Sequence, residues 1–368
     1  METSLLPTES ITQDRDDFVN TLFNSAVAAF QIFSVYIGDQ LGYYQELAKS
    51  DGLTVAELSS RTNTQERYTR EWLEQQASAC ILTVNGNTND PEKRHFHLSP
   101  AKAEVLVDRN SLNYMAPMAQ LVVGSVYPLE SLLDVYRKGG GVEFSQYGVN
   151  LREGQAKMNR PMFLAQLGSE WLPAIPDVHA RLQASPPARV ADIGCGAGWS
   201  CIGLARSYPN VRVDGFDLDA ASVDLANQNI EEANLRDRVS VQLRDASDAD
   251  LHGRYDLVTA FECLHDMTNP VGALRTMRNL AGDHGAVIVV DERSSPDFQP
   301  CSETLEQLLY GFSILHCLPV GMVDQPSAGT GTVMRPSTVE RYAQEAGFSR
   351  VEILPIDHFF FRFYRLVS

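Results

Sequence analysis

Basic residues are scarce in this sequence, and its cysteines are not paired. Against 47 Asp and Glu there are 30 Lys and Arg, which gives a formal net charge of −17 over 368 residues. A surface of that sign repels phosphate backbones and anionic lipid head groups, which argues against nucleic acid or membrane partners. The six cysteines include no CxxC pair, so we expect free thiols in a reducing cytoplasm and no metal site.

The sequence also lacks a secretion signal and an uninterrupted membrane-spanning run. Residues Met1–Ser10 contain neither a basic start nor an apolar stretch. The most apolar long window is Val19–Gly38, and its polar side chains are Asn20, Asn24, Ser25, Gln31 and Ser34. These are typical of a buried or interface helix rather than of a membrane span, and we expect a cytoplasmic protein.

The N-terminal region is predicted to be a long helix that cannot bury itself. From Asp14 to Ala48, apolar residues recur at steps of three and four and cover more than one helix face. A helix of this kind needs a partner. Two solutions remain open: burial within the chain, and a homodimer, which we favour.

The next segment is predicted to be a winged helix. Thr54 caps a short helix, Val55–Ser60, with Glu57 in the capping-box position. A second helix begins at Asn63 or Thr64 and runs through Ala79. The residues predicted to face inward on it are Tyr68, Trp72 and Leu73. A β-hairpin follows, with strands Ile81–Val84 and His95–Leu98 around a turn at Asn85-Gly86-Asn87.

A winged helix suggests either DNA binding or a dimerisation module. The helix that would enter a DNA groove, Gln65–Ala79, carries two arginines near its start, Arg67 and Arg70. It also carries three glutamates: Glu66, Glu71 and Glu74. Because no basic excess is left to contact phosphates, dimerisation is the favoured interpretation.

The chain length suits two domains, and the pattern changes along it. Residues 111–183 are helix-rich, with a break at Gly139-Gly140-Gly141. We place the boundary just after this break, giving a helical winged-helix domain over residues 1–145 and a second domain over 146–368. We expect an α/β Rossmann-like fold there, a doubly wound and mostly parallel sheet. The predicted strands are Arg189–Ile193, Val211–Phe216, Val239–Leu243, Tyr255–Phe261 and Ala286–Asp291. A terminal hairpin, Val351–Ile356 and His358–Leu366, should add an antiparallel edge.

A glycine turn and three acids mark a nucleoside site. The segment Val190–Gly198 is a strand that ends in Asp192 and enters a turn containing Gly194, Gly196 and Gly198. The next two strands end in Asp217 and Asp245, where an acid can bind a ribose diol or a base. Such an arrangement suits a nucleoside whose attached group is not a phosphate.

From Arg189 to the C-terminus the chain resembles a class I S-adenosylmethionine (SAM)-dependent methyltransferase. The resemblance implies that Asp192–Gly198, which includes Cys195, wraps the methionine part of SAM. It also implies that Asp217 holds the ribose hydroxyls and Asp245 the adenine amino group. The other residues expected around this cofactor, which leaves as S-adenosylhomocysteine (SAH), are Leu218, Ala246 and Phe261.

A second motif, Phe261–Met267, is similar to a segment of small-molecule O-methyltransferases that dimerise through a winged helix. In that family the histidine deprotonates the acceptor, which carries over to His265, followed here by Asp266. Glu292 matches an acid that orients the histidine. The chain departs from the pattern at Met267, where an aromatic residue is usual, and at Cys195, where a glycine is usual. His265 is therefore expected to be a base or a positioning residue.

The acceptor pocket is expected from segments outside the sheet. Its candidate residues are Tyr147, Met158, Asn159, Arg160, Phe163, His316 and Arg335. Arg160 or Arg335 would suit a carboxylate on the acceptor. The sequence leaves an oxygen or a sulfur acceptor open, including a small thiol or thioether acid of the kind used in sulfonium osmolyte synthesis. Two other functions remain: a regulator that senses the adenosyl ligand, and a repurposed methyltransferase fold.

Overall fold

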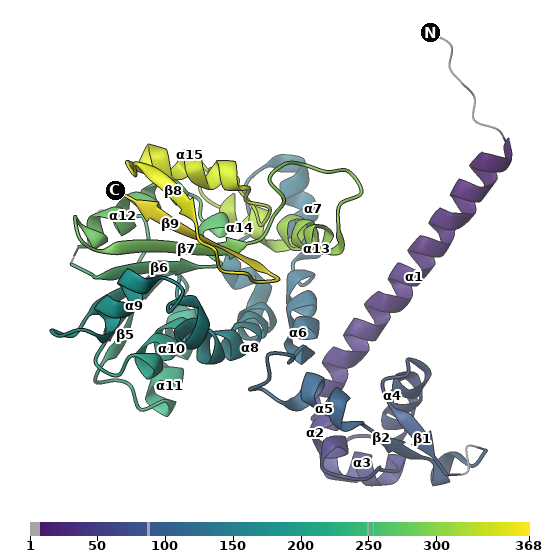
Figure 1. The fold of residues 1–368 in the computed structure, drawn as a ribbon. Coiled ribbons are helices and arrows are strands. Elements are labelled where there is room, and N and C mark those ends of the chain that lie inside the picture. Colours follow the sequence, from purple (N-terminus) through teal and green to yellow (C-terminus); the bar gives the residue numbers. More distant parts are fainter. Residues whose placement is uncertain (1–7, 87–88, 249, 253) are drawn as a thin grey trace. The chain divides into compact units, whose positions relative to one another are not determined.

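The computed structural model describes the chain except residues 1–7, 87–88, 249 and 253 (Figure 1). Part of the N-terminal segment examined for a signal, and Asn87 of the expected turn, lie outside the described residues. The chain divides into two compact units, Met1–Val123 and Gly124–Ser368. The boundary expected from the triple glycine, between residues 145 and 146, lies inside the second unit.

The first unit is built mainly of helices. Its elements in order, with α6 crossing the division, are α1 (Thr8–Gln40), α2 (Tyr43–Ala48), α3 (Val55–Thr62), α4 (Glu66–Ser78), β1 (Thr83–Asn85), η1 (Pro91–Lys93), β2 (His95–His97), α5 (Pro100–Val107) and α6 (Ala116–Ser125). The single helix expected over residues 14–48 is two helices, because the chain turns at Gly42, whose φ is 73°.

Capping decides where α3 and α4 begin. The Thr54 side chain accepts from the Glu57 backbone N–H, and the Glu57 side chain accepts from the Thr54 backbone N–H, as predicted. Asn63 ends α3 in the left-handed conformation, φ 53°, so α4 begins at Glu66 and not at Asn63 or Thr64. Trp72 and Leu73 face inward as expected, but Tyr68 is 78% exposed, so its prediction was wrong.

The loop of the predicted β-hairpin is longer than expected. Strands β1 and β2 pair antiparallel, with Thr83 opposite His97 and Asn85 opposite His95. Their connection contains the short helix η1, so it is longer than the three-residue turn predicted. Strand β1 begins two residues later than predicted and includes Asn85, which was expected in the turn, and β2 ends one residue earlier, at His97.

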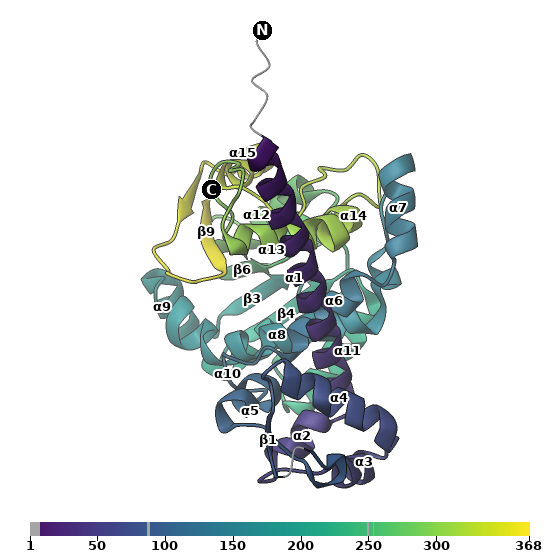
Figure 2. The same ribbon diagram turned by 90° about the vertical axis from the view of Figure 1, so that its right-hand side faces the viewer.

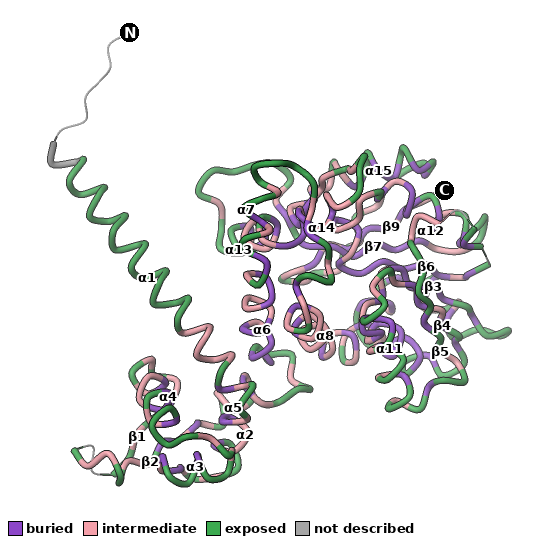
Figure 3. Tube along the Cα trace, turned by 180° about the vertical axis from the view of Figure 1, so that it is seen from behind, coloured by how far each residue is buried: buried purple, intermediate pink, exposed green. Residues whose placement is uncertain are grey.

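Helix α1 is the most exposed element of the first unit (Figure 3). Its exposed large apolar side chains are Ile11, Phe18, Val19, Leu22, Phe23, Val27, Phe30 and Ile37. Among the described residues, one helix meets the length and hydropathy of a membrane span, and it is this one, over Ile11–Gln40. Of the two solutions left open, burial of this helix within the chain is not seen among the described residues, and the favoured homodimer stays a prediction.

The second unit holds the seven-stranded sheet. Its helices are α7 (Leu129–Lys138), η2 (Phe144–Tyr147), α8 (Gly148–Ala165), η3 (Leu167–Trp171), α9 (Pro176–Gln183), α10 (Trp199–Ser207), α11 (Ala220–Glu232), η4 (Leu264–Asp266), α12 (Pro270–Ala281), α13 (Thr304–Phe312), η5 (Ser313–Cys317), α14 (Leu318–Gly321) and α15 (Pro336–Ala346). Its strands are β3 (Arg189–Ile193), β4 (Arg212–Asp217), β5 (Val239–Leu243), β6 (Leu257–Phe261), β7 (Ala286–Glu292), β8 (Arg350–Ile353) and β9 (Phe361–Val367).

The sheet is doubly wound, as predicted. The strand order is β5-β4-β3-β6-β7-β9-β8, in which β5 to β7 run parallel and β9 pairs antiparallel with both β7 and β8. Figure 2 shows β3, β4 and β6 between α12 on one side and α8 and α10 on the other. The predicted strands are matched to within two residues, except that β8 and β9 are shorter and joined by residues 354–360.

Each face of the sheet has its own hydrophobic core. Because side chains alternate along a strand, Val190 packs with α8 to α11 while Ala191 and Ile193 pack with α12 and α15. Both faces are thus covered, which is the condition under which parallel strands are stable. The layers leave the carboxyl ends of β3 to β6 free to form a binding site.

Candidate functional site

A cavity of 630 Å³ opens at the carboxyl ends of the parallel strands, within the second unit. Its volume lies in the range of small-molecule sites. The predicted cofactor residues that line it are Gly194, Cys195, Gly196, Asp217, Leu218, Asp245, Ala246 and Phe261. Of the remaining predicted residues, Asp266, Asn159 and Phe163 line it as well.

The glycine turn closes tightly over this cavity. Gly194 has φ 65°, and a Cβ there would lie 2.7 Å from the Cys263 Sγ. Gly196 has φ 50° and open space where a Cβ would be. The first glycine is required by packing, whereas the second leaves room beside the backbone for a ligand. Cys195, the departure from the family pattern, fits because Gly215 of β4 has no side chain to meet its Sγ.

Asp192, in the strand that leads into the glycine turn, is hydrogen-bonded within the core and does not line the cavity. Its carboxylate accepts hydrogen bonds from Ser200 and, at 2.7 Å, from the Thr259 hydroxyl. It is almost fully buried, and burial raises its pKa to about 6 despite these bonds. Gly198 is likewise outside the cavity lining. It is the N-cap residue of α10 and has the left-handed conformation.

Asp217 and Asp245 project from the ends of β4 and β5. The Asp217 Oδ2 accepts from the Gly196 backbone N–H at 2.7 Å, which ties the glycine turn to the neighbouring strand. Burial raises the pKa of Asp217. Asp245 accepts from the Ser247 N–H and hydroxyl through Oδ1. The Asp217 Oδ1 also accepts from the Asp219 backbone N–H at 2.9 Å, so backbone contacts position both oxygens of Asp217, whereas one oxygen of Asp245 is positioned by Ser247.

The cavity has an excess of negative charge. Among the described residues, the acids that line it are Glu143, Asp217, Asp219, Asp245, Glu262, Asp266 and Asp324. Its two arginines are already paired, Arg152 with Asp219 and Arg244 with Asp248, both at 2.7 Å. Such a site favours a ligand with a positive centre over an anion.

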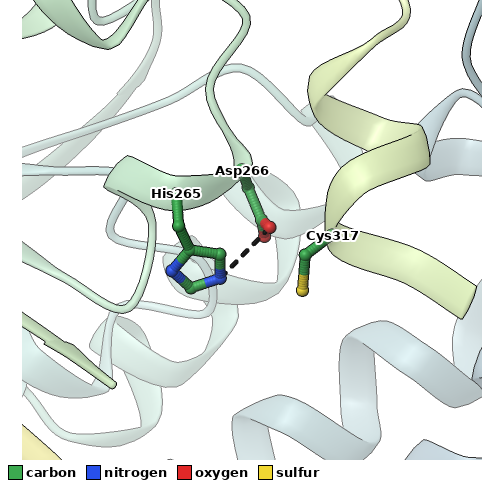
Figure 4. Close-up of side chains that lie close together, drawn as sticks. All are labelled: His265, Asp266 and Cys317. Atoms are coloured by element: carbon green, nitrogen blue, oxygen red, sulfur yellow. Dashed lines mark ion pairs between the residues drawn. The ribbon is translucent and has the colours of Figure 1, made fainter. Parts of the chain in front are cut away.

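His265 is held between carboxylates behind the cavity wall. Its Nδ1 lies 2.8 Å from Asp291 Oδ1 and 3.0 Å from Glu292 Oε2, and its Nε2 lies 3.2 Å from Asp266 Oδ1. Figure 4 shows the last pair, with Cys317 beside it. The ring is 2% exposed and does not line the cavity. The Nδ1 atom is hydrogen-bonded to Asp291, and the Nε2 atom lies within ion-pair distance of Asp266.

These ion pairs set the charges of the cluster. Burial lowers the pKa of His265, but Asp291, Glu292 and Asp266 together raise it well above its ordinary value. Burial opposes ionisation of Asp266, yet the His265 charge brings the Asp266 pKa to about 2. The raised pKa of His265 and the lowered pKa of Asp266 favour the charged forms of both, which pair at the cavity wall.

The cluster also contains two triads with metal-ligand atoms. The donor atoms of His265, Asp266 and Cys317 lie within 4.8 Å of one another, as do those of His265, Asp291 and Glu292. Burial raises the pKa of Cys317 to about 12, which favours the thiol over the thiolate that a metal binds. Ion pairing with His265 accounts for the positions of the three carboxylates, and Cys317 lies beside them as a thiol.

Asp291, beside His265, and Glu262, at the cavity, are among the site residues that sequence reasoning missed. Asp291 lies 2.8 Å from the His265 Nδ1, and its position directly before Glu292, the acid expected to orient the histidine, was the available signal. Glu262 follows Phe261, the last residue of β6, and lies within the Phe261–Met267 motif. It lines the cavity, is 8% exposed and accepts a hydrogen bond from the Asn159 side chain.

Several predicted acceptor residues lie away from the cavity. Tyr147 donates to the Leu315 carbonyl, and its ring meets His316 edge-on at 4.8 Å. The guanidinium of Arg160 lies 4.9 Å from the ring centre of Trp199. The described residues that line the cavity do not include Tyr147, Met158, Arg160, His316 or Glu292.

Arg335 is engaged elsewhere. Its guanidinium donates to the Glu306 carboxylate at 3.1 Å, to the Tyr310 hydroxyl at 3.2 Å and to the Ser295 carbonyl at 2.5 Å. Since Glu306 is itself buried, this arginine balances an internal charge. Neither Arg160 nor Arg335 therefore presents a carboxylate clamp to the cavity.

Comparisons with known proteins agree with this geometry. Residues 185–317 match the model of a methyltransferase domain family, and residues 28–108 match an Rv2258c-like winged HTH domain. Among curated proteins, ajmaline N-methyltransferase of Rauvolfia serpentina is 26% identical over 33% of this chain and 41% of its own length. The chain spans less than half the length of the curated relatives that it first matches, from 5% to 46%.

Solved structures are similar over nearly the whole chain. Mitomycin 7-O-methyltransferase has a TM-score of 0.71 at 19% identity, over 97% of this chain and 99% of that chain. Human N-acetylserotonin methyltransferase in complex with SAM has a TM-score of 0.68 at 18% identity, over 100% of both chains. At these identities the likeness establishes the fold. The chain therefore carries a winged helix-turn-helix domain followed by a methyltransferase domain.

Proposed function

We propose that this protein is a SAM-dependent methyltransferase that acts on an oxygen or sulfur of a small-molecule acceptor. The observation that carries the proposal is the glycine turn beside the cavity, with Asp217 and Asp245 at the ends of the next two strands. A sulfonium donor carries positive charge, and the acidic lining of the cavity suits it better than a nucleotide phosphate. The SAM and SAH complexes among the structural neighbours support the same cofactor.

The residues present fit SAM part by part. Gly196 leaves space against the backbone, Asp217 offers a carboxylate oxygen for the ribose, and Asp245 offers one for the adenine amino group. Leu218 and Ala246 supply apolar contact for the ring. When bound, SAM supplies an electrophilic methyl group on a positively charged sulfur. The protein aligns the acceptor with that methyl group and excludes water.

His265 is proposed as the base or as a positioning residue. Its Nδ1 is hydrogen-bonded to Asp291, while its Nε2 lies 3.2 Å from the Asp266 Oδ1, on the side of the cavity that Asp266 lines. As an imidazolium fixed by Asp291 and Glu292, it fixes Asp266 at the cavity wall. Its removal should therefore disturb the cavity and the fold together.

The assembly that we propose is a homodimer formed through α1. The apolar side chains of this helix, such as Phe23 at 69% exposure, need a partner, and a second copy supplies the same surface. DNA is a poorer partner, because Arg67 is paired with Glu71 and Arg70 with Glu92. The cations available to phosphates on α4 are thus neutralised.

Calorimetric titration with SAH tests the proposal. Replacing Asp217→Asn removes a charged acceptor and should weaken SAH binding by about 10–100-fold, since a hydrogen bond to a charged group contributes about 1.5–3 kcal/mol. The matched control, Asp283→Asn, changes an exposed acid outside the cavity lining and should bind SAH like the wild type. Equal affinity of all three proteins, or no binding by the wild type, would refute the cofactor assignment.

A further inference from the structure

His316 is a buried histidine outside the cavity lining, and the fold holds it firmly in place. It lies in η5, a π-helical turn between α13 and α14. π-Helical turns are rare, and they are found frequently at functional sites. The Tyr136 and Tyr147 hydroxyls donate to the carbonyls of Ile314 and Leu315, the two residues before His316. These two hydrogen bonds fix the turn and the ring that it carries.

One nitrogen of the His316 ring has no partner. The residue is 4% exposed, and its Nδ1 lies 3.4 Å from the Cys317 Sγ. Among the residues that the structure describes, none forms a hydrogen bond with the Nε2 atom. A buried polar atom without a partner destabilises the folded state, so packing alone does not explain this histidine.

His316 adjoins the cluster that contains His265. The Cys317 Sγ, which His316 contacts, lies within 4.8 Å of the donor atoms of His265 and Asp266. The Phe144 side chain lines the cavity and also packs against the His316 ring, with the ring centres 5.7 Å apart. Side-chain rotations of this size are common when a ligand binds. An acceptor that approaches His265 therefore reaches His316 as well, once the half-buried Phe144 ring turns aside.

The rest of the cavity indicates what kind of acceptor fits. Its apolar lining includes Phe144, Phe163, Phe261, Val320 and Val323. Both arginines that line it are paired with acids, so it offers no free cation among the described residues. Such a lining favours an apolar and uncharged acceptor over a carboxylate. A polar group opposite His316 is then a neutral oxygen.

We propose that His316 selects the acceptor, because its Nε2 hydrogen-bonds a hydroxyl or carbonyl oxygen next to the group that receives the methyl. This inference rests on the proposed methyl transfer. The acceptor is an apolar, uncharged compound with two neighbouring polar groups, one of which approaches His265 and the other His316. Burial lowers the pKa of His316, so its ring is neutral at pH 7 and can either donate to a carbonyl or accept from a hydroxyl.

Calorimetric titration of the SAH-saturated protein tests this role with three related compounds. They are naphthol, the naphthalenediol with a second hydroxyl on the adjacent carbon, and the hydroxynaphthoate with a carboxylate there. The wild type should bind the diol about 10-fold or more tighter than naphthol, and the naphthoate weakest. His316→Phe should bind the diol no better than naphthol, whereas His316→Gln, which keeps a polar atom near the Nε2 position, should retain part of the preference. Equal affinity of the wild type for diol and naphthol, binding of neither, tightest binding of the naphthoate, or an unchanged preference in His316→Phe would overturn the proposal.

Melting temperatures separate recognition from a structural role. Because the His316 Nε2 has no partner to lose, His316→Phe should melt at the wild-type temperature or above it. The matched control is His179→Phe, since the His179 Nδ1 lies 2.8 Å from the Tyr208 hydroxyl and the residue does not line the cavity. That variant should melt lower and keep the preference for the diol. A fall in melting temperature for His316→Phe would show a structural role and overturn the proposal, whereas failure of the wild type to bind SAH would refute the proposed function.

Discussion

Replacing Gly196→Ala is the sharpest local change to the proposed cofactor site. Gly196 has φ 50°, lines the cavity and has nothing within 4 Å of an added Cβ. The added methyl group therefore meets no protein atom and takes space that a ligand would use. Because the Gly196 N–H also donates to Asp217, a shift of the turn displaces the carboxylate assigned to the ribose.

The expected effects on stability and binding can be separated. An L-residue in the left-handed region costs about 1–2 kcal/mol. For a unit of this size, that lowers the melting temperature by about 2–8 °C. Loss of the close approach and of the Asp217 contact should weaken SAH binding by about 10-fold or more, because each charged hydrogen bond contributes about 1.5–3 kcal/mol.

The matched control is Gly347→Ala. Gly347 is also left-handed, with φ 95°, and a Cβ there would make only ordinary contacts with Arg278. It ends α15 and does not line the cavity. Both variants should show a similar fall in melting temperature by calorimetry, but only Gly196→Ala should lose SAH affinity. Equal SAH affinity in the two variants would refute the placement of the ligand against the glycine turn.

Four further predictions concern the His265 cluster and helix α1. His265→Gln should lower the free energy of unfolding by about 3–5 kcal/mol in urea denaturation, because it leaves buried carboxylates without their cation; an unchanged stability would contradict the imidazolium assignment. The pKa of Asp266 is lowered, so its contribution is present above pH ~4 and lost as pH falls toward about 2, and His265→Gln should flatten that acid limb. The pKa of His265 is raised, so its contribution is complete below pH ~6.5 and lost as pH rises through the higher folded value. Phe23→Glu should convert a dimer to a monomer in light scattering while Arg15→Glu does not; an unchanged mass would refute α1 as the interface.

The layered fold follows from patterns that are local in the sequence. Strand β5 was predicted to the residue, and the capping box at Thr54 and Glu57 was predicted with its partner. These features depend on side-chain alternation and on hydrogen bonds between residues three apart. The start of α4 was wrong because Asn63, a good N-cap residue, ends the preceding helix in the left-handed conformation instead.

The site was predictable where it depends on strand ends and was missed where it depends on packing. Asp217 and Asp245 line the cavity because carboxyl ends of parallel strands share one edge of the sheet. The sequence does not reveal that the His265 ring is buried outside the cavity lining, since that depends on the packing of Asp291 and Asp266 against it. Glu262 was missed for a related reason. An acid beside a strand end is expected at the surface, and its burial is visible only in the structure.

A crystal structure of the protein with SAH tests the central claim most directly. The claim predicts that SAH occupies the 630 Å³ cavity, with its homocysteine part against Gly196, its ribose on Asp217 and its adenine beside Asp245 and Ala246. SAH bound elsewhere, or a cavity that stays free of it at saturating concentration, would contradict the account.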